Sequence, residues 1–144
     1  MSNARIAIDA MGGDRAPKET VRGAVDAVKQ DETLEVVLVG REPDIRAELE
    51  IADLDAAQLS RLHVHHAANI VAGGEPAMAG YRKEDNSIRV SMELAKADDV
   101  HGVVAAGNTA ATVTAAVTVL KRLPHVGRPG IAVPLPTASG QSIL

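Results

Sequence analysis

The sequence contains no cysteine, phenylalanine or tryptophan, and Tyr81 is its only tyrosine. Without cysteine the chain has no disulfide, no thiolate nucleophile and no thiolate ligands for zinc. With Tyr81 as its single aromatic side chain, it lacks the stacking surfaces on which single-stranded nucleic acids bind. The net charge of −4 also gives no overall positive field. These absences exclude thiol chemistry and argue against a nucleic-acid partner.

Long hydrophobic runs are missing as well. The first apolar run is short and follows Arg5, which is not the pattern of a signal peptide. The longest uncharged helical candidate, residues 109–120, is shorter than the roughly 20 residues that span a bilayer. We therefore expect a cytoplasmic protein without a membrane-spanning helix.

Short apolar segments alternate with amphipathic ones along the chain. The pattern predicts strands at 5–10, 34–39, 61–65, 100–106 and 131–135, and helices after Pro17, after Pro43, at 87–96 and at 109–120. Residues 71–80 are predicted to be irregular. This alternation is typical of an α/β domain with a mostly parallel sheet between helices. There is no internal repeat or linker, so residues 1–144 have no internal domain boundary. Because residues 140–144 begin a new apolar segment, we expect the chain to be the N-terminal part of a longer domain.

Two glycine-containing loops follow predicted strands: Asp9 to Asp14, which reads DAMGGD, and residues 106–109, which read AGNT. Ligands of parallel sheets bind at the carboxyl ends of strands. Gly107, Asn108 and Thr109 also precede a helix, whose first N–H groups suit an anion such as phosphate. Neither loop is a Walker or dinucleotide-binding motif. Each loop taken alone is equally explained by glycines that serve only a turn.

The segment from Tyr81 to Ser87 is a third candidate. Arg82 and Lys83 could donate to phosphate or to an acidic partner protein, and Ser87 could cap a helix or donate to phosphate. The alternative is a solvated charged turn in front of a helix.

Other titratable residues give weaker patterns. His63 and His65 share a strand face with His66 next to them, but no third metal ligand is placed by the sequence. Asp9 and Asp14 could form a carboxylate pair for acid–base chemistry or magnesium, or Asp14 could support the following helix start. We predict no metal and no cofactor.

Taken together, these motifs resemble the PlsX family, the phosphate acyltransferases of bacterial phospholipid synthesis. The resemblance is carried by residues 8–14 (IDAMGGD) with Ala16-Pro17, by Arg82-Lys83 with Ser87, by residues 106–109 (AGNT) and by Arg128-Pro129. It implies a three-layer α/β/α sandwich like that of isocitrate and isopropylmalate dehydrogenases. It also implies a homodimer and a peripheral association with the membrane, through a region in the second half of the family's longer chains.

The activity that this resemblance implies is transfer of a fatty acyl group from acyl-carrier protein to inorganic phosphate, which gives acyl phosphate. Phosphate is itself the nucleophile, so the reaction needs no cysteine. We predict Asn108 and Thr109 as catalytic hydrogen-bond donors and leave the general base unassigned. The predicted substrate-binding residues are Asp9, Gly12, Gly13, Asp14, Arg82, Lys83, Ser87 and Gly107.

The chain departs from the family's usual pattern at a few positions. Arg15, Glu84, Asn86 and Ala110 stand where the family commonly has His, a basic residue, Ser and Gly. Glu84 lowers the positive charge where the carrier protein or phosphate would bind. Two other hypotheses stay open: a non-catalytic module that binds phosphate or carrier protein, and a phosphotransacetylase-like enzyme that uses acyl-CoA.

Overall fold

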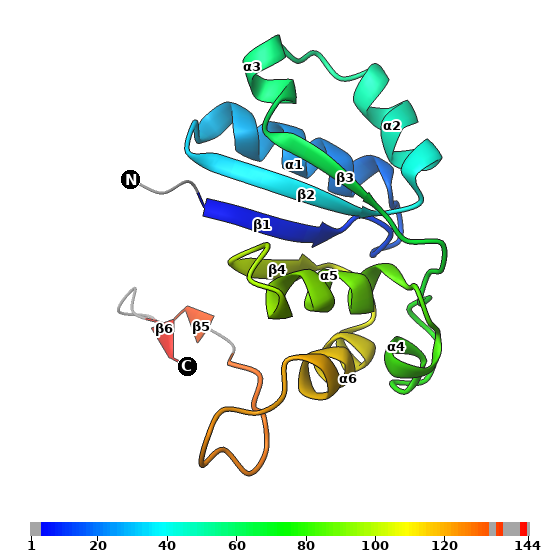
Figure 1. Ribbon diagram of the computed structural model, residues 1–144, viewed down its shortest axis with the longest axis vertical. Coiled ribbons are helices and arrows are strands. Elements are labelled where there is room, and N and C mark those ends of the chain that lie inside the picture. Colours follow the sequence, from blue (N-terminus) through cyan, green and yellow to red (C-terminus); the bar gives the residue numbers. More distant parts are fainter. Residues whose placement is uncertain (1–3, 133–134, 137–141, 144) are drawn as a thin grey trace.

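The computed structural model describes residues 4–132, 135–136 and 142–143. Its centre is a parallel sheet of four strands: β1 (Ala4–Asp9), β2 (Leu34–Gly40), β3 (Leu62–His66) and β4 (Gly102–Ala105) (Figure 1). The strand order is β3-β2-β1-β4, with Asp9 paired to Val39 on one side and to Ala105 on the other. β1 is therefore a central strand, and β4 and β3 are the two edge strands of this sheet.

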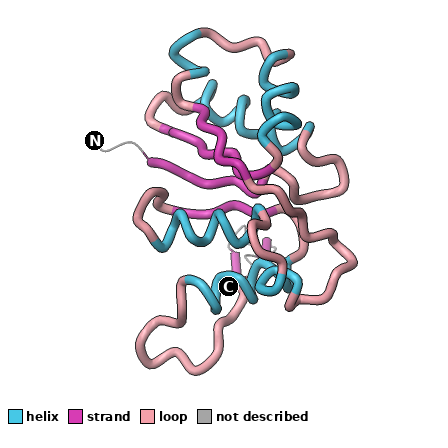
Figure 2. Tube along the Cα trace, turned by 45° about the vertical axis from the view of Figure 1, so that its right-hand side comes forward, coloured by secondary structure: helices cyan, strands magenta, loops and turns pink. Residues whose placement is uncertain are grey.

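Helices cover both faces of the sheet and make a three-layer α/β/α sandwich (Figure 2). On one face lie α1 (Lys18–Gln30), α2 (Glu42–Glu50) and the single turn α3 (Ala56–Leu59). On the other face α5 (Ser87–Lys96) packs on the sheet, and α6 (Thr109–Val119) packs on α5. The short helix α4 (Ala79–Arg82) lies against α6.

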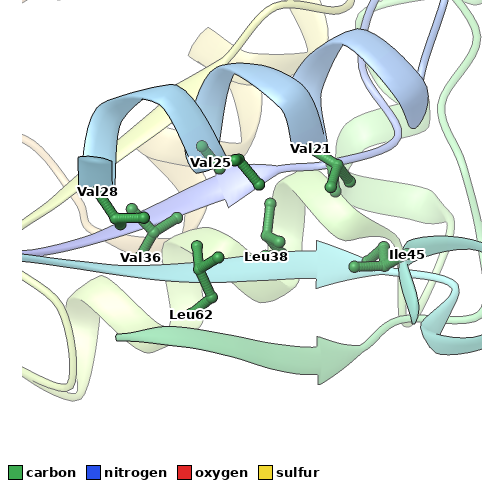
Figure 3. Close-up of a cluster of buried hydrophobic side chains, with 9 residues drawn as sticks. Val21, Val25, Val28, Val36, Leu38, Ile45 and Leu62 are labelled. Atoms are coloured by element: carbon green, nitrogen blue, oxygen red, sulfur yellow. The ribbon is translucent and has the colours of Figure 1, made fainter. Parts of the chain in front are cut away.

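The central strands are apolar on both sides because both sides are covered. Val36 and Leu38 of β2 face the layer of α1, whereas Val37 and Val39 face the layer of α5. Figure 3 shows how the first pair meets the buried stripe of α1 formed by Val21, Val25 and Val28, together with Ile45 and Leu62. Burying one such side chain contributes about 1.5–3 kcal/mol. The aliphatic core thus compensates for the lack of aromatic residues.

The structure confirms the predicted α/β class and the four strands and four long helices up to residue 120, with small shifts at their ends. The predicted strand at 131–135 is wrong at Ile131 and Ala132, which lie outside any strand. No described residue pairs with them, and an extended segment without a partner leaves its N–H and C=O groups unsatisfied. Residues 133–134 lie outside the described part. Strand β5 (Leu135–Pro136) instead pairs antiparallel with β6 (Ser142–Ile143).

The segment predicted to be irregular contains one helical turn. The turn begins at Pro76, whose carbonyl oxygen accepts a hydrogen bond from the N–H of Ala79. The carbonyl oxygen of Met78 then accepts from the N–H of Tyr81. α4 follows directly. Among the described residues, no helix is both long and apolar enough to cross a bilayer.

Candidate functional site

The order of the strands creates a crevice at the carboxyl ends of β1 and β4. The chain runs from β1 outward to β2 and β3, and then returns to place β4 on the other side of β1. At such a switch point the two following loops leave toward opposite faces of the sheet, and ligands bind between them. The loops after β1 and β4 are the DAMGGD and AGNT loops, so the structure brings the two predicted glycine loops together.

These two loops touch backbone to backbone. A Cβ atom added to Gly12 would lie 2.8 Å from the backbone nitrogen of Gly107 and 2.6 Å from Oδ2 of Asp9. A Cβ added to Gly107 would lie 3.1 Å from Cα of Gly12. Gly13 has a φ of +100°, a conformation that side-chain-bearing residues rarely adopt. The glycines therefore allow the two loops to approach each other closely and do not serve only to turn the chain. The sequence alone did not distinguish these two explanations.

A cavity of about 280 Å³ opens beside this contact. One wall is the pair of glycine loops, and the other is residues 70–73, which precede α4. The lining residues are Met11, Gly13, Asp14, Ile70, Val71, Ala72, Gly73, Ala106 and Gly107. A second, wider cleft lies between α1 and β4, and Gly13, Asp14 and Ala106 border both openings.

Backbone N–H groups of the glycine-loop wall are free. None of the hydrogen bonds between described residues uses the N–H of Gly13, Gly107 or Thr109. Thr109 is the first residue of α6, so its N–H also carries the positive end of the helix dipole. Gly13 and Gly107 line the cavity, and Thr109 follows two residues after Gly107 without lining it. Unpaired N–H groups near a helix start are a common arrangement for holding an anion.

Asn108 is the N-cap of α6, and its side chain also bonds to the opposite wall. Its Oδ1 accepts from the N–H of Ala111 at 2.9 Å. Its Nδ2 lies 3.2, 3.3 and 2.8 Å from the carbonyl oxygens of Ala72, Gly73 and Glu75. Asn108 is buried, with 6 % of the residue exposed. Its amide thus joins the two walls of the cavity.

Asp9 lies beneath the glycine loops, not in the cavity. The residue is 2 % exposed, and its Oδ1 accepts from the N–H of Met11 at 3.2 Å. Burial raises the pKa of this carboxyl above its ordinary value, while the Ser87 hydroxyl and the N–H groups of Met11 and Gly12 act in the opposite direction. The Ser87 hydroxyl comes near the carboxylate, but it makes no hydrogen bond of full geometry with a described residue.

The predicted capping role of Ser87 is wrong. Asn86 is the N-cap of α5: it is extended, and its Oδ1 accepts from the N–H of Arg89 at 3.0 Å. Its Nδ2 also donates to the carbonyls of Gly80 and Lys83, so it fastens α4 to the start of α5. Ser87 is the first helical residue and is 1 % exposed. An asparagine side chain reaches these carbonyls because it carries both an acceptor and donors.

The two predicted cationic residues differ in their surroundings. Lys83 is held: its Nζ donates to the Ile70 carbonyl at 3.0 Å and to Glu75 Oε1 at 2.7 Å. Arg82 is exposed, and its side chain makes no hydrogen bond or ion pair with a described residue. Asp14 is exposed at the border of the two openings.

The residues that sequence reasoning missed are Glu75 and the wall at 70–73. Their segment was read as irregular because of Gly73, Gly74 and Pro76, and no motif marked it as part of a site. His63 faces Glu35, with 3.3 Å between its Nε2 and the carboxylate. Within the ranges that the structure describes, no group of three His, Asp or Glu residues could hold a metal ion.

Comparison with known proteins gives a consistent result. A family model described as "Fatty acid synthesis protein" matches residues 4–144. Proteins named phosphate acyltransferase are similar to this chain over nearly all of its length. The one from Methylococcus capsulatus is 41% identical over 95% of this chain and 40% of its own. Those from Ectopseudomonas mendocina and Thermus thermophilus are 41% and 43% identical over 100% and 97% of this chain and 43% and 40% of their own.

The chain thus spans about two fifths of the length of the curated relatives that it matches. The motifs of the two glycine loops and of the segment from Arg82 to Ser87 lie inside the matched region. Because the family model covers nearly all of the sequence, this chain belongs to the PlsX family of fatty acid synthesis proteins.

Proposed function

We propose that this chain forms the phosphate-binding part of an enzyme that transfers a fatty acyl group from acyl-carrier protein to inorganic phosphate. The observation that carries the proposal is the joined wall of the two glycine loops, where Gly13 and Gly107 line a cavity and their N–H groups make no hydrogen bond with a described residue. The names of the relatives, phosphate acyltransferase, agree with an anion site of this kind. No cofactor is needed, since the reactants supply every group that is transferred.

The reaction places two demands on the site. A phosphate oxygen attacks the thioester carbonyl carbon, and an oxyanion forms. The C–S bond then breaks to give acyl phosphate, and the departing carrier thiolate takes up the proton that the phosphate loses. The site must therefore hold a dianion and stabilise the developing oxyanion. Preorganised N–H donors do both, and losing one oxyanion donor typically costs about 3–4 kcal/mol of transition-state stabilisation.

The residues divide into two groups in this proposal. Thr109, at the exposed start of α6, offers its hydroxyl and its N–H to the anion. Arg82 is free to reach an anionic substrate from the surface. Asn108 was predicted as a direct donor; because its amide is bonded to three loop carbonyls, we propose that it acts by holding the two walls together.

Asp9 and Ser87 are buried beneath the glycine loops and support them, and Gly12 allows the two loops to touch. Asp14 is placed at the border of the cavity, where it can limit the charge or the orientation of what enters. The general base stays unassigned, and a phosphate dianion needs none for its attack.

Acyl-carrier protein is the proposed donor, and a homodimer that associates peripherally with a membrane is the proposed assembly. The support for these partners is membership of the family, whose model is described as a fatty acid synthesis protein. Location in the cytoplasm follows the same reasoning and remains a proposal.

The test is a direct assay of acyl-phosphate formation. The chain is incubated with inorganic phosphate and either acyl-carrier protein loaded with a fatty acyl thioester or acyl-CoA, and acyl phosphate is trapped with hydroxylamine. Product from acyl-carrier protein supports the proposal, and product from acyl-CoA alone supports the phosphotransacetylase-like alternative. No product, with no saturable binding of phosphate either, would contradict the assignment of the site.

A further inference from the structure

The segment 70–75, here called the 70–75 loop, is held by two side chains from other parts of the chain. Lys83 donates from Nζ to the carbonyl of Ile70 at 3.0 Å and to Oε1 of Glu75 at 2.7 Å. Asn108 directs Nδ2 at carbonyl oxygens within the same loop, the nearest being that of Glu75 at 2.8 Å. The loop is therefore fixed from the end of α4, where Lys83 lies, and from the start of α6, where Asn108 lies.

Glu75 is the centre of these contacts. Its Oε1 accepts from Lys83 and also from the N–H of Ala72 at 2.8 Å, so one oxygen closes the loop on itself and ties it to Lys83. The hydrogen bond from Lys83, followed by that from Ala72, lowers the pKa of Glu75, which keeps it charged at neutral pH. The side chains of Glu75 and Lys83 are 28% and 40% exposed, so attraction between the charges alone stabilises little. The contribution of Glu75 is instead that its Oε1 accepts from both Lys83 and Ala72 and so fixes the position of the loop.

Packing supports the outer part of this loop only weakly. Val71 is buried against Ile88 and Ala111. Beyond it, a Cβ added to Gly73 or Gly74 would meet no heavy atom within 4 Å. Polar contacts rather than apolar packing therefore set where residues 72–75 lie.

The position of this loop determines the shape of the cavity. Residues 70–73 form the wall that faces Gly13 and Gly107, the residues with free N–H groups. If the loop moved away, an anion on those N–H groups would be more exposed to water, and its hydrogen bonds would be weaker.

We propose that Glu75 is a positioning residue of the anion site: held by Lys83, its carboxylate fixes the 70–75 loop as the wall opposite Gly13 and Gly107. Lys83 then acts through Glu75 rather than as the direct cationic contact. The inference rests on the proposed function for the nature of the anion, inorganic phosphate.

The test compares Glu75→Met, Glu75→Gln and the control Glu32→Gln in the whole chain. Glu32 is exposed, and its side chain makes no hydrogen bond or ion pair with a described residue. NMR gives two readouts: amide hydrogen exchange at residues 72–74, and the dissociation constant of inorganic phosphate from the shifts of the Gly13 and Gly107 amides. Methionine removes the acceptor at similar length, whereas glutamine keeps one oxygen that can accept from Ala72 and Lys83.

We expect Glu75→Met to speed exchange in the loop and to weaken phosphate binding about tenfold, as for loss of a charge-assisted hydrogen bond. Glu75→Gln should give intermediate values, and Glu32→Gln should match the wild type. Unchanged loop exchange in both Glu75 variants would overturn the inference, as would faster exchange with unchanged phosphate affinity. If Glu75→Met does not fold, Glu75→Gln decides alone. If the wild type binds no phosphate, the proposed function fails, and the exchange data still decide whether Glu75 holds the loop.

Discussion

At the scale of single residues, Asp9 combines burial with a charge-bearing group. It ends β1, it is 2 % exposed, and the glycine loops lie on top of it. A carboxylate removed from water is costly unless hydrogen bonds compensate. The N–H of Met11 provides one such bond, yet burial dominates and the pKa of Asp9 is raised.

The raised pKa predicts how stability changes with pH. Above its folded pKa, Asp9 is ionised in both the folded and unfolded states, and the buried charge lowers the free energy of unfolding. This penalty disappears as the pH falls through the folded pKa toward the ordinary value of 3.8. Asp9→Asn keeps an acceptor for Met11 without the charge, so it should be at least as stable as the wild type at pH 7. The advantage should shrink toward pH 4.

Urea unfolding at several pH values measures this difference, with Asp26→Asn on the exposed side of α1 as the control. A stability difference between Asp9→Asn and the wild type that stays constant with pH would show that Asp9 is not the group responsible.

Gly12 gives a second prediction at this scale. In Gly12→Ala the new methyl group would meet Oδ2 of Asp9 at 2.6 Å and the backbone nitrogen of Gly107 at 2.8 Å, so the two loops must separate. We expect a loss of about 1–3 kcal/mol in the free energy of unfolding, as for other overpacked sites. Phosphate binding should also weaken. Calorimetry and a phosphate titration check both, and Gly74→Ala, where no heavy atom lies within 4 Å, should leave both nearly unchanged.

At the scale of elements, α4 and α6 approach each other through a glycine. A Cβ added to Gly80 would lie 2.6 Å from the carbonyl oxygen of Ala111 and 3.1 Å from its Cβ. The carbonyl of Gly80 also accepts from Asn86, so this one residue joins α4 to both following helices. Any shift of α4 would therefore move Lys83 and, through its hydrogen bonds, the 70–75 loop.

Two glycine substitutions in helices should have opposite effects. Gly80→Ala should destabilise by about 1–3 kcal/mol, because the methyl group meets backbone atoms that cannot move aside. Gly23→Ala, on the exposed side of α1 with open space around it, should stabilise by about 0.5–1 kcal/mol through helix propensity. Thermal unfolding of the two variants tests the pair. Equal effects in the same direction would contradict this account of the α4–α6 contact.

The elements show which features could be predicted from the sequence. Helix α1 was predictable because Val21, Val25 and Val28 repeat at helical spacing after Pro17. The glycine loops were identified by motif, but their contact depends on β4 lying next to β1. The order of strands in a sheet cannot be predicted from local sequence patterns. Lys83 could not be assigned a partner, because Glu75 belongs to a segment without periodicity and meets it only after α4 folds.

At the scale of the whole molecule, several large apolar side chains remain exposed. Val104 on the edge strand β4 is 52% exposed, and Leu123 and Ile131 after α6 are 77% and 64% exposed. An exposed, apolar edge strand is a surface on which another chain can pair or pack. These residues belong to a chain that matches about two fifths of the length of its relatives.

We therefore expect the isolated chain to self-associate as its concentration rises. Val104→Lys should reduce this association, because a charged side chain on an edge strand opposes pairing. Sedimentation velocity over a range of concentrations is the measurement, with Val126→Lys testing whether the segment after α6 contributes. A strictly monomeric wild type at high concentration would refute the expectation.

The contact between Gly12 and Gly107 also bears on the order of folding. These residues belong to the first and last strand–loop units of the four-stranded sheet, and they meet only when β4 has docked beside β1. A chain that has folded β1, β2 and β3 alone would have half of the anion wall and no site. Phosphate that binds the joined loops would then stabilise only the complete sheet, by mass action. A rising concentration of phosphate would therefore increase the fraction of chains in which β4 is docked beside β1.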